Sequence, residues 1–562
     1  MLRATQRSSA FANVTSAGNI GKSFAPGSTN MATTTANVLK QHLALISRKD
    51  GESSQAPFPG TDKVRLEEVK NAPLFSAGVK KFIQLSITDT GSIYPQYGLI
   101  GLRLETNTGD ESRSEKESRK ATDNLVYANI TTPWSTFICG SQGSGKSHTL
   151  SCLLENALLL PSMVGKLSRP LAAIIFHYDK FTAFSSTQLC EAAYLCSAGI
   201  PVRVLVSPSN FTAMKKLYSN MPGISSNGPK PKVVPLYFRE DDLNISMMKT
   251  LMAVGDETPL YMEVVTKILR EMAQAAQGSA GFNFARFKQL LHDQRFIKGQ
   301  MGPLNLRLQL LESFLQKGKQ NTVPGDIWEF KPGTLTVVDL SCPFVEEADA
   351  CALFNICLSL FMERRSEGGR LVALDEAHKF LSTNTAEATG FTDTLLSLIR
   401  QQRHLATRVV IATQEPTLSP GLLDLCNVTI VHRFTSPAWY KTLEHHLAGA
   451  LLGKRKEGSK SAADDSKDLF EQIVRLGTGE ALLFCPTAML DVVSQVSNET
   501  SATLKNGSDG EPEETEEDTA SSSSVSFVFA SSKVVQELGT RYVTIKVRQR
   551  VTTDGGRSIL AE

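Results

Sequence analysis

The sequence predicts an α/β protein built on a parallel sheet, with an all-helical insertion and small β-rich additions on its N-terminal and C-terminal sides. Three observations lead to this fold class. From residue 136 onward, short apolar segments alternate with helical segments, which is typical of a parallel sheet covered by helices on both faces. Residues 241–324 break this rhythm, because they show helical spacing without a strand pattern. Alternating apolar residues occur before and after the α/β region, as expected of half-buried strands.

The strands expected in the central sheet are short and mostly apolar. In chain order they are Thr136–Cys139, Ala172–Phe176, Val202–Val206, Leu335–Leu340, Leu371–Leu374, Val409–Ala412 and Val428–His432. The helices expected in the insertion are Leu260–Gln274, Phe284–Asp293 and Leu304–Lys317. Outside this region, alternation predicts strands at Lys81–Ile87, Gly98–Leu104, Val525–Ala530 and Arg541–Arg550.

These patterns divide the chain into seven segments. They are a disordered basic leader (1–58), a small β-rich region (59–130), the first part of the α/β domain (131–240), the helical insertion (241–324), the second part of the α/β domain (325–497), a disordered acidic linker (498–524) and a C-terminal β segment (525–562). The leader and the linker are expected to be disordered because they are rich in small polar residues and poor in periodic apolar ones.

Composition and charge exclude several classes of protein. The 562 residues are 41% hydrophobic and 21% charged, and this near-average composition excludes a collagen, a fully disordered chain and a disulfide scaffold. The net charge of +2 combines the leader, which has no acidic residue before Asp50, with the strongly acidic linker. The remainder is almost neutral, so bulk charge does not predict nonspecific nucleic-acid binding.

The cysteines and the hydropathy pattern bear on the compartment. The 9 cysteines form no CxxC pair, which favours buried free thiols in a reducing compartment and does not favour a zinc site. No apolar run reaches the roughly 18 residues of a membrane span, so we expect a soluble intracellular protein of the nucleus or cytoplasm. The leader is also compatible with a mitochondrial transit peptide, because it is rich in serine and contains Arg3 and Arg7.

Residues 140–147 match the phosphate-binding pattern G-x-x-x-x-G-K-[ST]. The match follows an apolar strand and precedes a helical segment, the context that this loop requires. Glycines allow successive backbone N–H groups to surround phosphate oxygens at the positive end of the helix dipole. Lys146 would reach the β- and γ-phosphates of ATP, and Ser147 would bind Mg²⁺. The expected nucleotide-binding residues are Gly140, Ser141, Gln142, Gly143, Ser144, Gly145, Lys146, Ser147 and His148.

A second motif places two carboxylates after an apolar strand. Asp375 and Glu376 follow the strand at 371–374, and the carboxyl ends of parallel strands are where ligands bind in such sheets. Asp375 would hold Mg²⁺ through water, and Glu376 would polarise the attacking water. His378 is either a partner of these carboxylates or a polar residue at the start of a helix.

Two further residue types would complete an ATP-hydrolysing site. Gln414 ends the strand at 409–412, where its amide would hydrogen-bond both the water and the γ-phosphate. Arg400 and Arg403 lie three residues apart and share a helix face. One of them would act as an arginine finger on a neighbouring subunit, or both are surface charges.

Together these residues resemble the HerA–FtsK superfamily of ring-forming ATPases, most closely the HerA type. The resemblance rests on residues 139–147, on residues 374–380 and on residues 402–414, with further matches up to Phe434. It implies a RecA-like P-loop sheet with a helical insertion, a hexameric ring and double-stranded DNA as the translocated polymer. It also implies that Arg403, eleven residues before Gln414, contacts the nucleotide of the neighbouring subunit.

The function expected from the sequence is therefore an ATPase that uses ATP and Mg²⁺ to move DNA. The string Asp375-Glu376-Ala377-His378 also suggests a DExH-type helicase, but the sequence lacks the Q-x-x-G-R-x-G-R motif of those enzymes. A nucleotide-gated scaffold or switch is a further alternative. Lys546, Arg548 and Arg550 share one strand face, which would either follow DNA phosphates or form a solvated sheet edge.

Overall fold

The computed structural model describes residues 63–86, 93–107, 121–160, 163–180, 188–252, 260–276, 282–294, 296, 298–316, 326–364, 368–381, 385–446, 462–494 and 533–555. These residues belong to one compact unit, Lys63–Glu562. The predicted basic leader, the acidic linker and the strand Val525–Ala530 lie outside the described residues.

The described strands form a single 16-stranded sheet with a parallel centre. Its parallel strands, in spatial order, are β12 (Val428–His432), β4 (Ser135–Cys139), β11 (Thr407–Thr413), β10 (Arg370–Leu374), β6 (Ala172–His177), β9 (Leu335–Asp339), β7 (Val202–Val206) and β8 (Lys232–Pro235). Each of the seven strands expected in the central sheet is confirmed, and the fold is the expected α/β fold with a parallel sheet at its centre.

The sheet continues past β12 in a mainly antiparallel extension. From β12 outward its strands are β13 (Glu480–Phe484), β16 (Tyr542–Val547), β2 (Tyr97–Asn107), β3 (Leu125–Asn129), β1 (Leu74–Ser76), β14 (Met489–Ser494) and β15 (Lys533–Glu537), and β5 (Gly165–Lys166) pairs with β2. The strands expected at 98–104 and 541–550 are therefore present. The N-terminal and C-terminal strands share this one sheet with the α/β core, which local sequence patterns did not reveal.

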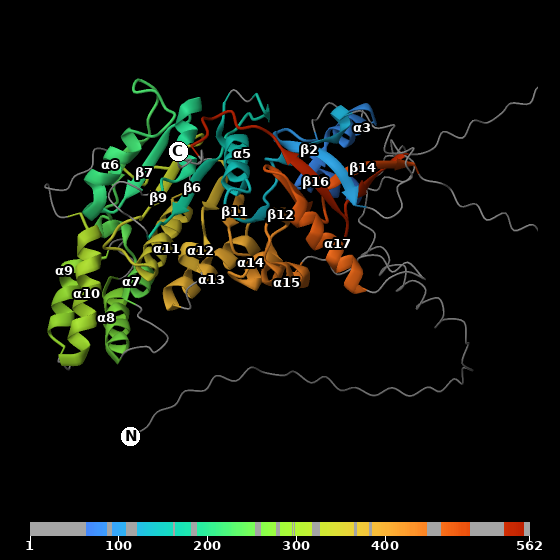
Figure 1. The fold of residues 1–562 in the computed structure, drawn as a ribbon. Coiled ribbons are helices and arrows are strands. Elements are labelled where there is room, and N and C mark those ends of the chain that lie inside the picture. Colours follow the sequence, from blue (N-terminus) through green and yellow to red (C-terminus); the bar gives the residue numbers. More distant parts are fainter. Residues whose placement is uncertain are drawn as a thin grey trace, which may run out of the picture. The chain divides into compact units, whose positions relative to one another are not determined.

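Helices cover both faces of the sheet (Figure 1). On one face, α5 (Lys146–Leu158) and α6 (Phe211–Ser219) pack on apolar residues such as Ile138 and Ile175. The opposite face is covered by α11 (Glu347–Glu363), α12 (His378–Leu381), α13 (Ala386–Arg400), α14 (Pro420–Leu425), α15 (Pro437–His446) and α17 (Ala462–Arg475). Neighbouring strand residues thus face different core clusters, as expected of strands buried on both sides.

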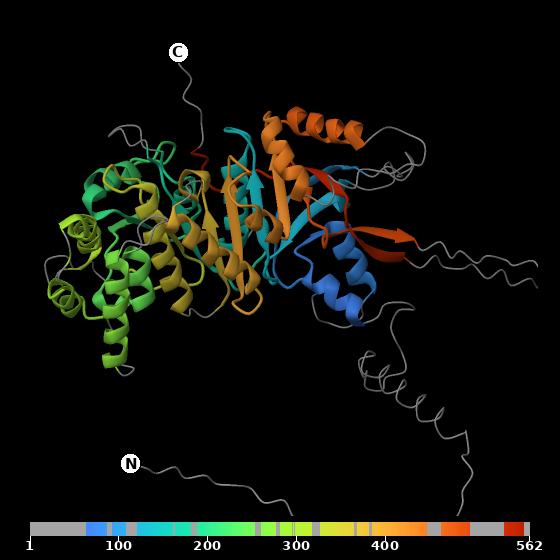
Figure 2. The same cartoon turned by 90° about the horizontal axis from the view of Figure 1, so that it is seen from below.

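The helical insertion is confirmed. It consists of α7 (Ile245–Met252), α8 (Leu260–Ala276), α9 (Phe284–His292) and α10 (Lys298–Phe314). Within the unit Lys63–Glu562, these helices lie at the end away from α2 and α3 (Figure 2). Among the described residues of this segment, the only strand-like pairing is the isolated bridge between Phe238 and Leu315.

The strand expected at Lys81–Ile87 is wrong, because Ala77–Ser86 forms the helix α3, which follows α2 (Lys63–Asn71). Val79 and Ile83, four residues apart, are both buried in a small apolar cluster with Phe75 and Tyr94. The Ser76 hydroxyl accepts a hydrogen bond from the Val79 N–H at 3.1 Å, which satisfies one free donor at the helix start. The burial of Val79 and Ile83 therefore favours a helix here, although the alternating apolar residues of this segment are typical of a strand.

All 9 cysteines are free, and all except the partly exposed Cys426 are buried. Among the helices of the described part, none is long and apolar enough to cross a membrane.

Candidate nucleotide-binding site

The loop between β4 and α5 has the backbone of a phosphate-binding loop. Gly140, Gly143 and Gly145 adopt positive φ values of 153°, 72° and 113°, which glycine tolerates without steric cost. A Cβ atom at residue 140 would lie 2.7 Å from the Cβ of His432, whereas residue 143 has open space around it. Helix α5 begins at Lys146, directly after the loop, so its free N–H groups face the region where the glycines turn.

Hydrogen bonds within the loop hold this shape. The Ser141 N–H and hydroxyl both donate to the Arg433 carbonyl, at 2.9 and 2.8 Å. The Lys146 ammonium and the Ser144 hydroxyl donate to the Ser141 carbonyl, at 3.0 and 2.7 Å. Burial lowers the pKa of Lys146, while the charges of Glu376 and Asp375 act in the opposite direction. Lys146 therefore lies between the loop and the two carboxylates.

The two carboxylates leave the sheet at the same edge as the loop. Leu374, the last residue of β10, pairs with Phe176 and Ile411 of the neighbouring strands, and the Asp375 N–H donates to the Phe176 carbonyl at 3.0 Å. Asp375 and Glu376 are both buried. Glu376 has a positive φ of 50°, a conformation that costs a non-glycine residue about 1–3 kcal/mol and that is concentrated at functional sites.

Gln414 and His378 contact the strained glutamate directly. The Gln414 amide donates to Glu376 Oε2 at 3.1 Å, and the Gln414 backbone N–H donates to His378 Nδ1 at 3.4 Å. His378 Nδ1 also lies 3.4 Å from Glu376 Oε2. Burial lowers the pKa of His378 despite the opposing charge of Glu376, so a neutral ring that accepts from Gln414 fits the geometry. The structure thus brings His378 and Gln414 together with Glu376.

His432 is a supporting residue whose role the sequence motifs did not reveal. The ring is fully buried between β12 and α5; its Nδ1 donates to the Glu480 carbonyl at 3.0 Å, and its Nε2 accepts from the Thr149 hydroxyl at 2.9 Å. Burial lowers the pKa of His432 to about 4, so the ring is neutral near pH 7. Thr149 and His432 lie 283 residues apart in the sequence, and no local pattern reports such a contact.

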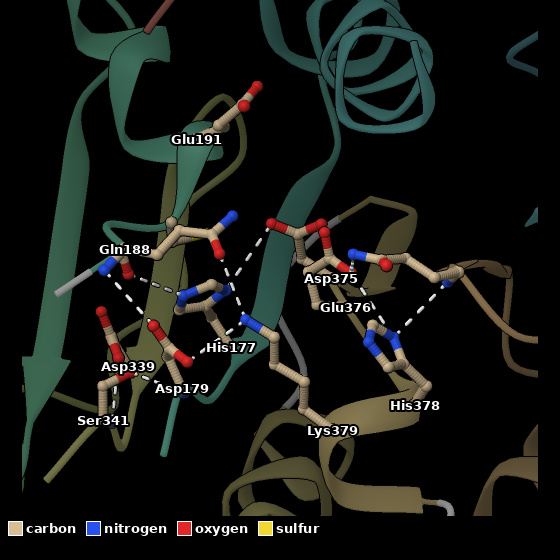
Figure 3. A network of polar contacts seen from close by, with 12 residues as sticks. His177, Asp179, Gln188, Glu191, Asp339, Ser341, Asp375, Glu376, His378 and Lys379 are labelled. Atoms are coloured by element: carbon tan, nitrogen blue, oxygen red, sulfur yellow. Dashed lines mark hydrogen bonds and ion pairs between the residues drawn. The ribbon is translucent and has the colours of Figure 1, made fainter. Parts of the chain in front are cut away.

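Behind Asp375 lies a network of polar side chains (Figure 3). His177 Nε2 is 3.1 Å from the Gln188 carbonyl, and His177 Nδ1 is 3.6 Å from Asp375 Oδ2. Burial would lower the pKa of His177, but its interactions with Asp375 and Asp339 raise it to about 9. The Lys379 ammonium contacts Asp179 Oδ1 at 3.3 Å and Gln188 Oε1 at 3.1 Å. These contacts join Asp179 and Gln188 to the helix that begins after Glu376.

A nearby glutamate also has a shifted pKa. Burial and the charge of Asp375 raise the pKa of Glu191 to about 7, although Arg550 acts in the opposite direction. Glu191 is the first residue of η2 (Glu191–Ala198). The negative charge of Asp375 is therefore felt beyond its immediate contacts.

Arg403, Arg400 and Arg433 take different positions. Arg403 is exposed and precedes the N-terminal end of β11, whereas Gln414 follows its C-terminal end. A seven-residue strand such as β11 spans about 23 Å, so Arg403 lies at the opposite edge of the sheet from Gln414. Arg400 is exposed at the end of α13, and Arg433 is exposed beside the phosphate loop.

His148, expected to contact nucleotide, lies against the C-terminal segment of the chain. Its Nε2 atom is 2.8 Å from the Arg548 carbonyl. In this structure its ring therefore joins α5 to the residues that follow β16.

The basic residues expected to share a strand face do not lie at a solvated sheet edge, and of the three only Lys546, with 48% of its side chain exposed, faces solvent. β16 lies inside the sheet between β13 and β2. The Arg548 guanidinium is 2.7 Å from Glu155 Oε2 and only 6% of its side chain is exposed, and Arg550, 2% exposed, lies 3.4 Å from Glu191. Glu155 also accepts from the N–H and hydroxyl of Thr552 at 2.9 and 2.6 Å. These hydrogen bonds lower the pKa of Glu155, although its burial acts in the opposite direction.

No family model and no curated protein sequence matches this chain. Solved structures to which it is similar include VirB4 of Thermoanaerobacter pseudethanolicus, at 13% identity and a TM-score of 0.42, over 71% of this chain and 95% of that one. Another is the genome-packaging NTPase B204 of Sulfolobus turreted icosahedral virus 2 in complex with ATP-gammaS, at 9% identity and a TM-score of 0.24, over 63% of this chain and 92% of that one.

Proposed function

We propose that this chain is an ATPase of the HerA–FtsK type that works as a hexameric ring and moves double-stranded DNA. The observation that supports the ATPase best is the meeting of two motifs at one sheet edge. The phosphate loop after β4 and the carboxylates after β10 emerge at the same edge of the sheet, on either side of β11, and Glu376 is strained and hydrogen-bonded to Gln414. A structural loop would require neither the strain nor the buried carboxylates.

In this proposal the loop N–H groups and Lys146 bind the phosphates of ATP. Ser147 and Asp375 offer oxygen donors that suit Mg²⁺, and this ion would neutralise phosphate charge. Glu376 accepts the proton of the attacking water, and Gln414, held against Glu376 at 3.1 Å, orients that water. The neutral ring of His378 supports the Gln414 backbone. Water then attacks the γ-phosphate in line with the leaving oxygen.

The position of Arg403 supports the proposed hexameric ring. At the far edge of the sheet, this exposed side chain is remote from the phosphate loop of its own chain but free to approach that of a neighbour. An arginine supplied by a neighbouring chain is a known way to stabilise the charge that develops during phosphoryl transfer. DNA as the load rests on the family resemblance, because Arg548 and Arg550 of the basic C-terminal segment are buried in ion pairs.

The test is the ATPase rate of the full chain with and without double-stranded DNA, together with its mass in solution with a nonhydrolysable ATP analogue. A hexamer with DNA-stimulated turnover at low salt, lost steeply as salt is raised, is the expected result. Turnover that ignores DNA, combined with ATP-dependent assembly, would instead identify a nucleotide-gated switch. Absence of turnover in every condition would contradict the ATPase.

A further inference from the structure

Three side chains of the kinds that bind transition metals converge behind the phosphate site. They are His177 at the end of β6, Cys190 directly before η2, and Asp375 after β10. Their ligand atoms all lie within 4.8 Å of one another, and all three residues are buried. Because β6 and β10 are neighbouring parallel strands, with Phe176 paired to Leu374, His177 and Asp375 leave the sheet side by side.

In its present orientation, the His177 ring has one nitrogen, Nδ1, without a hydrogen bond in the described part of the chain. Nε2 faces the Gln188 carbonyl at 3.1 Å, and a carbonyl only accepts, so Nε2 carries a proton. Nδ1 is fully buried and makes no hydrogen bond within the described part of the chain, and the nearest carboxylate oxygen, Asp375 Oδ2, is 3.6 Å away. Figure 3 shows the ring between Gln188 and Asp375. A metal-binding histidine commonly donates its other N–H to a carbonyl in this way.

The surroundings favour a cation and hold Cys190 in place. The Cys190 N–H donates to the Tyr218 hydroxyl at 3.2 Å, and this hydroxyl donates to Asp339 Oδ2 at 2.5 Å. Asp339 is fully buried and also accepts from the Ser341 N–H at 3.0 Å. The carboxylates of Asp339 and Asp375 therefore place negative charge near the sulfur and the imidazole, and either a proton on His177 or a bound metal cation would offset it.

We propose that His177, Cys190 and Asp375 form a site for a transition-metal ion of the zinc class. Imidazole nitrogen, thiolate sulfur and carboxylate oxygen are ligands that Zn²⁺ uses, with a fourth position open to solvent or another ligand. Two ligands at about 2.1 Å from a tetrahedral ion lie about 3.4 Å apart, close to the 3.6 Å between His177 Nδ1 and Asp375 Oδ2. Metal binding displaces the Cys190 thiol proton to solvent and leaves a thiolate–metal bond.

The test uses the full chain freed of metals with a chelator, without nucleotide and in excess Mg²⁺, to which one equivalent of Co²⁺ is added. We expect the visible bands of tetrahedral cobalt and a near-ultraviolet thiolate-to-cobalt charge-transfer band. Cys190→Ser should remove the charge-transfer band, and His177→Gln should weaken Co²⁺ binding at least about 10-fold. Cys196→Ser is the matched control, because this buried thiol lies in η2 and contacts the Pro229 carbonyl; it should keep both signals.

Several results would overturn the site. One is the absence of a thiolate band in the wild type, which would leave a protonated His177 paired with Asp375 as the better description. Another is a band that survives in Cys190→Ser. If Cys190→Ser fails to fold, as judged by circular dichroism, His177→Gln together with Cys196→Ser still decides the outcome.

A second measurement tests whether Asp375 binds both the transition-metal ion and the Mg²⁺ that accompanies ATP, and it rests on the proposed function. Adding Mg²⁺ with a nonhydrolysable ATP analogue should reduce the charge-transfer band, because Asp375 would then serve Mg²⁺. An unchanged band with bound nucleotide would contradict the sharing of this carboxylate. Failure of the analogue to bind would instead contradict the proposed function, while the cobalt bands would still report the metal site.

Discussion

Glu376 combines three features of the proposed site: a strained backbone, a buried carboxylate and a hydrogen bond to Gln414. Its φ of 50° is maintained because β10, the Gln414 amide and the following helix all fix its position. Burial next to Asp375 leaves few positions for its carboxylate, and Gln414 holds one oxygen. The surrounding sheet offsets the cost of this backbone conformation, and the result is a carboxylate held in one orientation.

Changing Glu376→Gln should therefore separate binding from chemistry. The amide keeps the shape and hydrogen-bonding capacity of the side chain but cannot accept the proton of water, so turnover should fall about 10²–10⁴-fold. Binding of a fluorescent ATP analogue should stay within a few-fold of wild type. The exposed Glu471 of α17 offers the control variant Glu471→Gln, which should hydrolyse ATP normally. Wild-type turnover in Glu376→Gln would refute the base assignment.

His432 predicts how stability depends on pH. Its pKa in the folded chain is about 4, below the ordinary value of about 6.5, so the unfolded chain takes up a proton first as pH falls. The stability that the neutral ring contributes is therefore present near pH 7 and is lost as pH falls from about 6.5 towards 4. Between pH 7 and pH 5 the loss is about 2 kcal/mol.

Urea unfolding at these two pH values measures this effect. The wild type should lose about 2 kcal/mol more between pH 7 and pH 5 than His432→Gln does, because the amide does not titrate. The exposed His404 provides the control His404→Gln, which should follow the wild type. Equal pH dependence in the wild type and His432→Gln would show that the ring is not held neutral.

Sequence motifs located the residues of the site that lie close together in the chain, and missed those brought together by the fold. Lys146, Asp375 and Glu376 belong to short motifs, and the end of an apolar strand pointed to Gln414. The partners of His432 come from distant segments, so only the sheet order brings them into contact.

The helices and strands show the same contrast: the sequence predicted the elements that depend on nearby residues and missed the arrangements that depend on distant ones. Most central strands are buried on both faces, so their composition alone marks them, and seven of the eight parallel strands were predicted. The eighth, β8, lies at the edge of the sheet and is only partly buried. Helix α3 was mistaken for a strand because its apolar face is small and its burial depends on Phe75 and Tyr94. The pairing of β16 between β13 and β2 could not be predicted, because alternation identifies a strand without identifying its neighbours.

The segment after β16 should contribute strongly to stability. Arg548 donates to Glu155, to Asn156 and to the carbonyls of Leu99 and Cys152, at 2.7 to 3.0 Å. Removing its charge leaves the fully buried Glu155 without its main charged partner, and we expect Arg548→Ala to cost about 3–5 kcal/mol of unfolding free energy.

Thermal or urea unfolding checks this expectation against a surface pair. Arg475 pairs with Glu471 on α17, and both side chains are more than half exposed. Arg475→Ala should therefore change the unfolding free energy by at most about 0.5 kcal/mol. A similar effect of both variants would mean that the C-terminal segment does not secure α5.

At the scale of the whole molecule, the opposite positions of Arg403 and Gln414 predict that a complete site needs two chains. Arg403→Ala and Lys146→Ala should each abolish turnover. When mixed, some interfaces combine an intact loop from one chain with an intact arginine from the other, so part of the ATPase rate should return. Arg400→Ala is the matched control. Mixing this variant with Lys146→Ala should give no turnover beyond the rate that Arg400→Ala shows by itself. Mixed rings that stay inactive would count against action between subunits.

The position of β16 also determines when the molecule can fold. β2 and β13 are both made before β16, yet each pairs with it on one side. While the chain is being synthesised, both strands therefore have an unpaired edge, and such edges readily pair with other chains. Since pairings between distant segments form slowly, release of the C-terminal strand from the ribosome should be the step that joins the N-terminal strands to the central parallel sheet.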